Sequence, residues 1–478
     1  MKSKTRTALI LGAAGAAVAT ALVLDLGHAE SAAPSRGATP VEPASCGTPA
    51  PSHADAKLEH GKLTGALSAG KLARGGGGDL HAEFEIATQA AANTQRPPLD
   101  LAFVIDRSGS MSGDRLEHAK SAARGIVEKL GAQDHVALIQ YDDAAQVVVS
   151  SLVMDDGGKT KMEHAIAALE TGGSTNLEAG LELGRHEVER VYVSGEASRV
   201  MLLSDGMANV GIIDPKRIAD TAREAANHGV RVTSVGIGLD FNEDLMESIA
   251  EAGRGNYHYV KSASDLDKTI AGELASVQAT VATNVELRLT TSCGAQLAAV
   301  HGYESHKDGD ATVVPMPDLF GGDDRKLLVS LRVPDATLGE TRALHAELVY
   351  RDTAGGATHR EPIDLGVQLT DDRDAAIASA DPDVMAEVFK LEAAESMRQA
   401  AQEYEHGNAG SAAAIIATTQ HHIEAKQAAY KLKPAAAAEA LGDLDEMDKD
   451  TKAYAPGTAQ ATDLVKSTKA KARAMSKK

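Results

Sequence analysis

The chain has 478 residues, of which 43% are hydrophobic and 3% aromatic, with no tryptophan. This length is enough for two or three domains, whose cores must be built mainly from aliphatic side chains. The formal net charge of −20 argues against nucleic-acid binding, which requires clustered lysine and arginine, and favours metal cations as ligands.

Residues 1–29 have the pattern of an export signal. Three basic side chains lie within residues 2–6, an apolar run rich in Ala and Gly extends to Leu24, and Gly27 and Ala29 are small enough for a cleavage site. We therefore predict a secretory signal peptide, with an uncleaved membrane anchor that tethers the protein as the alternative. The expected location is periplasmic, secreted or associated with the cell envelope.

Residues 30–78 are rich in Ala, Pro, Ser and Gly, a composition typical of a disordered linker. In the next segment, residues 79–96, Leu80, Phe84 and Ile86 alternate with polar side chains, which predicts a half-buried strand. Because no partner strand is evident nearby in the sequence, we expect this strand to pair with a β domain further along the chain.

Residues 97–278 alternate strand and helix patterns. The continuous apolar run at 101–105 predicts a strand buried on both faces, and apolar side chains then recur at helical spacing. Strand candidates at 136–141 and 147–149 are close enough to form a hairpin. The segment therefore predicts a doubly wound, mostly parallel α/β sheet with one antiparallel edge strand, closed by a last helix that begins at Ser264.

The remainder of the chain changes character twice. Residues 279–372 contain several period-two segments without helical spacing, which predicts a small β-sandwich domain. Residues 373–478 are Ala-rich with helical spacing, and Gly407-Asn408 predicts the turn of a helical hairpin. The basic side chains near the C-terminus favour a solvated, fraying end, with contact to an acidic partner or surface as the alternative: Lys466, Lys469, Lys471, Arg473, Lys477 and Lys478.

Three loops in residues 97–278 carry oxygen donors. Asp106 directly follows the first buried strand, and Ser108 and Ser110 follow at alternate positions. Thr175 lies in a Gly-Gly-Ser-Thr-Asn loop, and Asp205 lies in a Ser-Asp-Gly loop after another buried strand. Ligands bind beyond the carboxyl ends of the strands in such sheets, so we expect these loops to meet. Carboxylates and hydroxyls suit Mg²⁺, and also Mn²⁺ or Ca²⁺.

Together these loops resemble the von Willebrand factor type A family, whose metal-ion-dependent adhesion site has Asp-x-Ser-x-Ser, a distant Thr and then an Asp. The resemblance implies that Ser108 and Ser110 bind the metal directly and that Thr175 binds it directly or through water. It also implies that Asp106 and Asp205 act mainly through hydrogen bonds and water. An open coordination position then accepts a Glu or Asp carboxylate from a partner protein.

The expected function is that of an exported, non-enzymatic binding or adhesion protein. The alternative is an accessory subunit that acts with an AAA+ ATPase in complex assembly or metal insertion, which would require a cytosolic domain. The chain also distantly resembles the inter-α-trypsin inhibitor heavy chains, although their large N-terminal β domain does not fit before residue 98.

No enzyme signature is complete in the sequence, so neither catalytic nor organic-cofactor residues are predicted. His186 begins a zinc-protease pattern, but Arg190 stands where its second His would be. The two cysteines, Cys46 and Cys293, could form a disulfide in an exported protein or remain two unrelated thiols.

Overall fold

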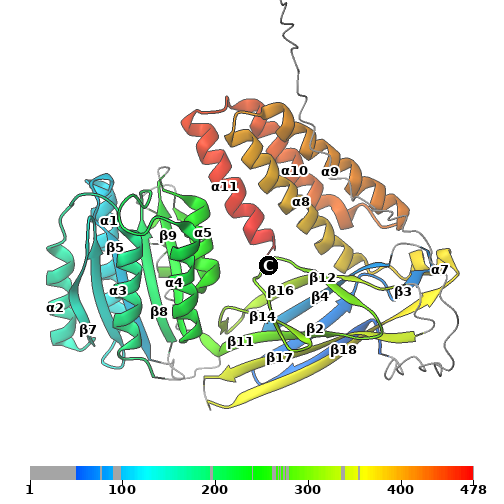
Figure 1. Cartoon of the computed structure of the whole chain (residues 1–478), viewed down its shortest axis with the longest axis horizontal. Coiled ribbons are helices and arrows are strands. Elements are labelled where there is room, and N and C mark those ends of the chain that lie inside the picture. The colour runs from blue at the N-terminus through cyan, green and yellow to red at the C-terminus, as the bar shows by residue number, and fades with distance from the viewer. Residues whose placement is uncertain are drawn as a thin grey trace, which may run out of the picture. The chain divides into compact units, whose positions relative to one another are not determined.

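The computed structural model describes residues 50–476, except 76–77, 90–97, 194–196, 239–240, 335–339, 354–355 and most of 261–278. Ser45–Lys478 form one compact unit. Within this unit Figure 1 shows an α/β domain, a group of β-strands and a set of C-terminal helices. The signal peptide and Cys46 lie outside the described residues, so cleavage and the Cys46–Cys293 disulfide stay predictions. No helix in the described part of the chain is long and apolar enough to span a bilayer.

The α/β domain contains a six-stranded sheet in the order β10-β9-β8-β5-β6-β7. All neighbours are parallel except the edge pair β6–β7, which confirms the predicted mixed sheet. The central strands are buried along their whole length. The strand bounds are β5 Leu99–Asp106, β6 His135–Tyr141, β7 Ala145–Val153, β8 Ala197–Ser204, β9 Val230–Ile237 and β10 Arg254–Val260.

Helices cover both faces of this sheet. Side chains of α1 and α2 join one hydrophobic core, and side chains of α3, α4 and α5 join the other. This double covering is the doubly wound architecture that the sequence predicts. The helix predicted from Ser264 lies mostly outside the described residues. The helix bounds are α1 Asp114–Lys129, α2 Asp156–Ala167, α3 Leu177–Glu189, α4 Pro215–Asn227 and α5 Glu243–Ala252.

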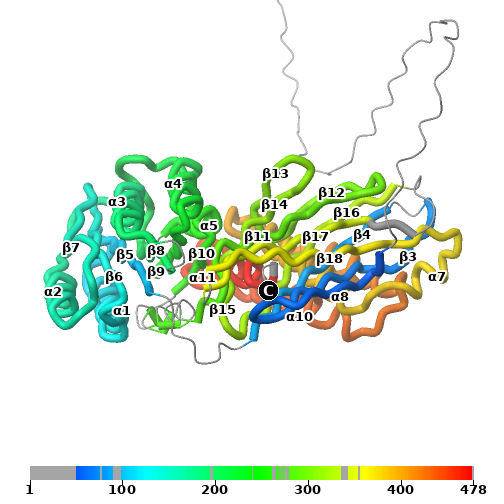
Figure 2. The backbone as a smooth tube through the Cα atoms, turned by 90° about the horizontal axis from the view of Figure 1, so that it is seen from below, coloured from blue at the N-terminus to red at the C-terminus, as the bar shows by residue number. Residues whose placement is uncertain are grey.

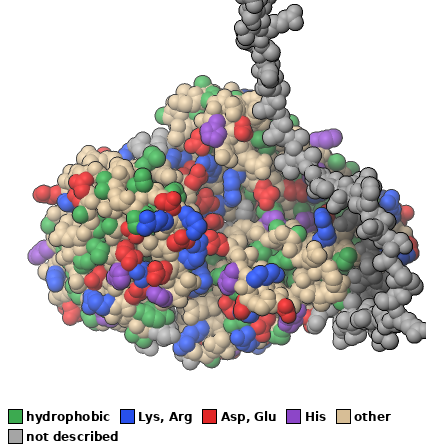
Figure 3. All heavy atoms as spheres, in the orientation of Figure 1, with side chains coloured by type: hydrophobic (Ala, Val, Ile, Leu, Met, Phe, Trp, Pro, Cys, Tyr) green, Lys and Arg blue, Asp and Glu red, His purple; other side chains and the backbone are tan. Residues whose placement is uncertain are grey.

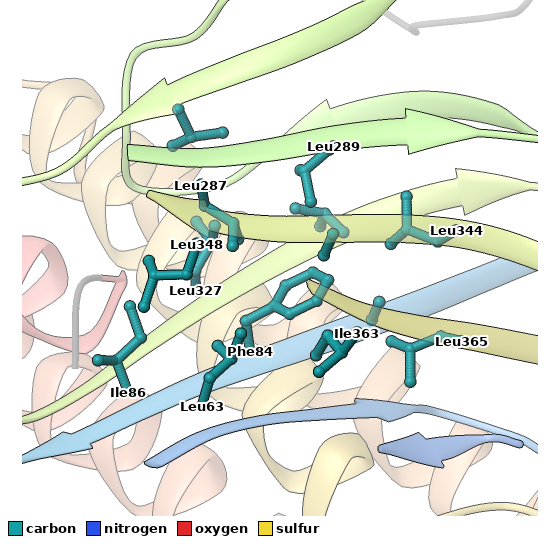
Figure 4. Close-up of a cluster of buried hydrophobic side chains, with 14 of the residues drawn as sticks. Leu63, Phe84, Ile86, Leu287, Leu289, Leu327, Leu344, Leu348, Ile363 and Leu365 are labelled. Atoms are coloured by element: carbon teal, nitrogen blue, oxygen red, sulfur yellow. The ribbon is translucent and has the colours of Figure 1, made fainter. Parts of the chain in front are cut away.

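The β domain is a sandwich of two sheets that share one core. One sheet has the order β1-β2-β4-β16-β12, and the other has the order β13-β14-β11-β17-β18-β3, with β15 beside β11. Figure 4 shows Phe84 of the first sheet close to Ile363 and Leu365 of the second. The later strands are β11 Thr280–Thr291, β12 Gln296–Val300, β13 His306–Asp308, β14 Ala311–Pro315, β15 Leu319–Phe320, β16 Asp324–Arg332, β17 Glu340–Asp352 and β18 Thr358–Thr370.

Four strands of the sandwich precede the α/β domain: β1 His53–Leu58, β2 Gly61–Leu67, β3 Lys71–Ala73 and β4 Asp79–Thr88. Figure 2 shows them among the later strands. Strand β4 pairs with β16, but it also pairs with β2, so a partner nearby in sequence does exist. The prediction of a disordered linker over 30–78 is therefore wrong for residues 53–73, where small side chains pack closely in a sheet. A Cβ at Gly65 would lie 2.6 Å from Ile363 Cδ1.

Two buried arginines of the α/β domain meet an aspartate of the sandwich. Arg231 on β9 donates from Nε and Nη2 to Asp318 Oδ1 at 3.1 and 2.7 Å, and Arg199 on β8 lies 3.9 Å from Asp318 Oδ2. All three side chains are at most 5% exposed. Burial raises the pKa of Asp318, but the two guanidinium groups outweigh it and hold this pKa below its ordinary value.

The helical region contains more than the predicted hairpin. The turn at Gly407-Asn408 separates α8 from α9, as expected, and Gly407 has a φ of +84° that favours glycine. Two further helices pack with this pair in a common core. The bounds are α7 Arg373–Ala378, α8 Pro382–Glu405, α9 Ala409–Ala429, α10 Ala435–Ala453 and α11 Ala459–Ser476.

The basic end of the chain is not solvated along α11, so that interpretation is wrong there. Lys466 donates to the Phe241 carbonyl at 2.9 Å and lies 3.7 Å from the centre of the Phe241 ring. Arg473 pairs with Glu247 of α5 at 3.2 Å. The acidic surface that we considered as the alternative is thus formed by this chain's own α5, α8 and α10. Lys477 and Lys478 lie outside the described residues.

Burial lowers the pKa of His81 to about 4, with the positive charge of Lys426 as a smaller cause. The folded chain therefore holds His81 neutral where the unfolded chain, with a pKa of 6.5, takes up a proton. This contribution to stability is complete above pH 6.5 and is lost as the pH falls towards 4, by about 3 kcal/mol in total.

Urea unfolding at a series of pH values should show the free energy of unfolding falling between pH 6.5 and 4. We expect His81→Gln to reduce the slope of this free energy against pH. His345→Gln, which alters a more exposed histidine paired with Asp364, serves as the control. An unchanged slope in His81→Gln would refute the assignment.

Candidate metal centre

The first site loop begins where β5 ends. Asp106 is fully buried, and its Oδ1 accepts the Ser108 backbone N–H at 2.8 Å. Its Oδ2 accepts the Ser204 hydroxyl, also at 2.8 Å, which ties the end of β5 to the end of β8. Asp106 thus fixes the loop that presents the two serines.

The two serines and the third loop are joined by hydroxyl contacts. Ser108 Oγ and Ser110 Oγ are 3.1 Å apart. Ser110 Oγ donates to Asp205 Oδ1 at 2.7 Å, although the two residues are 95 positions apart in sequence. The side chain of Asp205 is fully buried. Oxygen donors from the ends of β5 and β8 therefore converge at one place.

The second loop brings Thr175 to the same place. The Gly109 N–H donates to the Gly173 carbonyl at 2.9 Å, which holds the first two loops together. A Cβ built on Gly206 would lie 3.3 Å from Ser110 Oγ and 3.5 Å from Thr175 Oγ1, so both hydroxyls adjoin Gly206. All five predicted site residues thus meet at the carboxyl edge of the sheet.

The structure adds site residues that the sequence pattern does not include. Asn209 Oδ1 accepts the Thr175 backbone N–H at 2.8 Å and orients that loop. Asp142 follows β6 at the same edge and pairs with Arg107 at 2.6 Å. A Cβ at Gly172 would lie 2.0 Å from Asp142 Oδ2, so this close approach requires glycine. The position of Asp142 after a buried strand, like that of Asp106, is a signal that could have identified it.

The electrostatics of the site favour a cation. Burial raises the pKa of Asp106 to about 6, against the hydrogen bonds that it accepts from Ser108 and Ser204. Arg115 Nη1 lies 2.5 Å from Asp205 Oδ2 and partly offsets this second buried carboxylate. Two carboxylates beside one guanidinium leave negative charge in the site. Because the surrounding donors are hydroxyl oxygens, the residues fit Mg²⁺ or a similar hard divalent ion.

The described part of the chain holds no metal site built from His, Cys, Asp and Glu side chains alone. No three His, Cys, Asp or Glu side chains there gather closely enough to hold a metal ion among themselves. The candidate site instead combines its two carboxylates with serine and threonine hydroxyls.

Comparisons with known proteins agree with this architecture. The family model described as "von Willebrand factor type A domain" matches residues 100–272. The uncharacterized protein YfbK of Escherichia coli is 33% identical over 209 residues, which cover 43% of this chain and 36% of that protein. The uncharacterized protein sll0103 of Synechocystis sp. is 29% identical over 296 residues, which cover 59% of this chain and 69% of that one.

Two further matches extend the comparison. Human inter-alpha-trypsin inhibitor heavy chain H3 is 28% identical over 223 residues, 45% of this chain and 25% of the human protein. The solved structure of von Willebrand factor type A from Catenulispora acidiphila has a TM-score of 0.64 at 19% identity, covering 82% of this chain and 96% of that chain. At that identity the structure shows a common fold. Residues 100–272, the α/β domain, therefore form a von Willebrand factor type A domain.

Proposed function

We propose that this protein binds a partner protein through a divalent cation held by Asp106, Ser108, Ser110, Thr175 and Asp205. The observation that carries the proposal is the meeting of three hydroxyls with two buried carboxylates at one sheet edge. Type A domains mediate protein–protein interactions.

Each residue has a distinct part in this proposal. Ser108 and Ser110 hold the cation through neutral oxygens, and Thr175 adds a third hydroxyl. Asp106 fixes the Ser108 backbone, and Asp205 orients the Ser110 hydroxyl by accepting its hydrogen bond. The cation, most suitably Mg²⁺, supplies positive charge that a carboxylate can neutralise. Because the direct donors are neutral, much of that charge is left for a Glu or Asp side chain of the partner.

A capture experiment tests the proposal. The immobilised protein should retain a Glu-containing peptide from a random library in Mg²⁺ and release it in EDTA. The same peptide with Gln in place of Glu is the matched control. Retention that is equal in Mg²⁺ and EDTA, or equal for Glu and Gln, would contradict carboxylate recognition through a cation.

We also propose that the protein works outside the cytoplasm. The support is the basic and apolar pattern of residues 1–29, which lie outside the described part of the chain. Cell fractionation with mass spectrometry of the mature N-terminus tests this proposal. Retention in the cytosol with an intact N-terminus would instead favour the role beside an AAA+ ATPase.

Arg115 should set the metal affinity of this site. Its guanidinium contacts Asp205 at 2.5 Å and is 31% exposed, so it competes with an incoming cation for the same carboxylate. We expect Arg115→Met to tighten Mg²⁺ binding roughly tenfold, about 1.4 kcal/mol, in calorimetric titration. Arg115→Lys, which keeps the charge, should bind Mg²⁺ within a few-fold of the wild type. Weaker Mg²⁺ binding in Arg115→Met would show that Arg115 supports the site instead.

A further inference from the structure

A cavity lies between the sandwich and the C-terminal helices. Its walls come from β3, β4 and β16 of the sandwich and from α7, α8 and α9, and its volume is about 660 Å³. Small-molecule sites commonly enclose 300–1,000 Å³, so this space is large enough for an organic ligand. It shares no residue with the candidate metal centre, and its function is independent of the one proposed above.

The polar floor of this cavity is formed by His81 of β4 and Ser330 of β16, which are hydrogen-bonded to each other. Ser330 Oγ lies 3.2 Å from His81 Nδ1 and 2.8 Å from His301 Nε2, so one hydroxyl bridges two imidazoles. Burial and the charge of Lys426 lower the pKa of His81, which shows that positive charge acts on this floor. A bound anion would offset that charge.

The charges that line the cavity differ in sign from the chain as a whole. Lys71, Arg373 and Lys426 line it, against a single acidic residue, Asp79, among the lining residues that the structure describes. Asp79 faces Arg332 at 3.5 Å, and Lys426 pairs with Glu392. Neither Lys71 nor Arg373 pairs with an acid in the described ranges. In a chain of net charge −20, two unpaired cations at one cavity favour an anionic ligand.

The remaining wall is apolar. Leu72 of β3 and Ile377 of α7 are half-buried, and Met385 and Val388 of α8 are buried, yet all four line the same space. A small hydrophobic cluster of Leu328 with Val384, Val388 and Leu391 packs α8 against the sheet beside this space. An alkyl group placed against this wall would gain roughly 0.8 kcal/mol for each buried CH₂, which a fully polar anion would not.

From the cavity's volume, unpaired cations and apolar wall we propose that it binds a small amphipathic anion, an alkyl chain that ends in a carboxylate. The carboxylate pairs with Lys71 and Arg373, and the chain lies against α7 and α8. Figure 3 shows that acidic and basic side chains are interspersed over the visible surface.

Calorimetric titration of the full chain with three probes tests the proposal. Octanoate should bind, whereas octylammonium, with the same chain and opposite charge, and acetate, with the same charge and almost no chain, should bind at least tenfold more weakly. Equal binding of octylammonium would show that the cavity recognises only the alkyl chain and would contradict anion binding. Absence of octanoate binding would also overturn the proposal.

Variants locate the binding within the chain. The double variant Lys71→Glu, Arg373→Glu should weaken octanoate binding at least tenfold, while Lys216→Glu, Arg360→Glu, which reverses two exposed charges elsewhere, should not. Ala429→Trp, at an exposed position of α9 that lines the cavity, should block binding without loss of fold. Unaltered binding in either cavity variant would place octanoate somewhere else.

An NMR titration supplies a readout that is independent of affinity. Octanoate should raise the pKa of His81 from about 4, because its carboxylate brings negative charge into the cavity that His81 lines. The pKa of His345, which lies outside the cavity, should not move. A His81 pKa that octanoate leaves unchanged would contradict binding at this floor.

Discussion

Asp318→Asn is expected to lower the free energy of unfolding by about 3–5 kcal/mol, because it leaves the buried guanidinium groups of Arg231 and Arg199 without their carboxylate. The cluster of Asp318, Arg231 and Arg199 joins the α/β domain to the sandwich, so the substitution should destabilise both domains. Urea unfolding followed by circular dichroism measures it, since the chain has no tryptophan to report by fluorescence.

The matched control is Asp308→Asn, which removes another Asp–Arg pair of the sandwich. Asp308 pairs with Arg288 at 2.6 Å, but its side chain is 60% exposed, so the expected loss of stability is much smaller than for Asp318→Asn. The pH dependence adds a second measurement. The contribution of Asp318 is complete above its unfolded pKa and is lost as the pH falls through its lower folded pKa. If Asp318→Asn and Asp308→Asn lowered the free energy of unfolding equally, burial would not explain the effect of Asp318.

The second large effect is expected at the candidate metal centre. Asp106→Ala should weaken Mg²⁺ binding by roughly 10–100-fold, because it frees the Ser108 backbone and removes negative charge next to the hydroxyl donors. Calorimetric titration with Mg²⁺ measures the change. Folding should survive, since burial disfavours the Asp106 carboxylate and raises its pKa to about 6.

Asp214→Ala is the control for this experiment. Asp214 is also an acidic residue of the α/β domain, but its carboxylate caps α4 by accepting the Arg217 N–H at 2.9 Å. Its substitution should leave Mg²⁺ affinity unchanged. If the wild type does not bind Mg²⁺, or if Asp106→Ala binds it equally well, the metal-dependent function proposed above is wrong.

The sequence predicts the α/β domain well because its signals are local. Long apolar runs mark the central strands, and Asp106 and Asp205 stand at the ends of two of them. A parallel sheet must bring such ends to one edge, so the meeting of the site residues follows from strand order alone. Arg115 could not be assigned in this way, because its contact with Asp205 depends on the direction in which α1 leaves the loop.

The predictions that fail are those that depend on distant partners. Strand β2 contains Gly65 and Ala66, whose small size resembles a linker until Ile363, almost 300 positions later, is seen against Gly65. The basic residues of α11 look solvated until their partners are seen, namely the Phe241 carbonyl for Lys466 and Glu247 of α5 for Arg473. Neither pairing leaves a periodic signal in the sequence.

The order of the strands in the sandwich also has a consequence for how the protein is made. Strand β4 emerges from the ribosome well before β16, and the whole α/β domain is synthesised between them. Until then β4 has only β2 beside it, and its other edge presents unpaired backbone groups that invite pairing with another chain. The sandwich can therefore close only after the inserted domain has been synthesised, and this edge of β4 stays open until then.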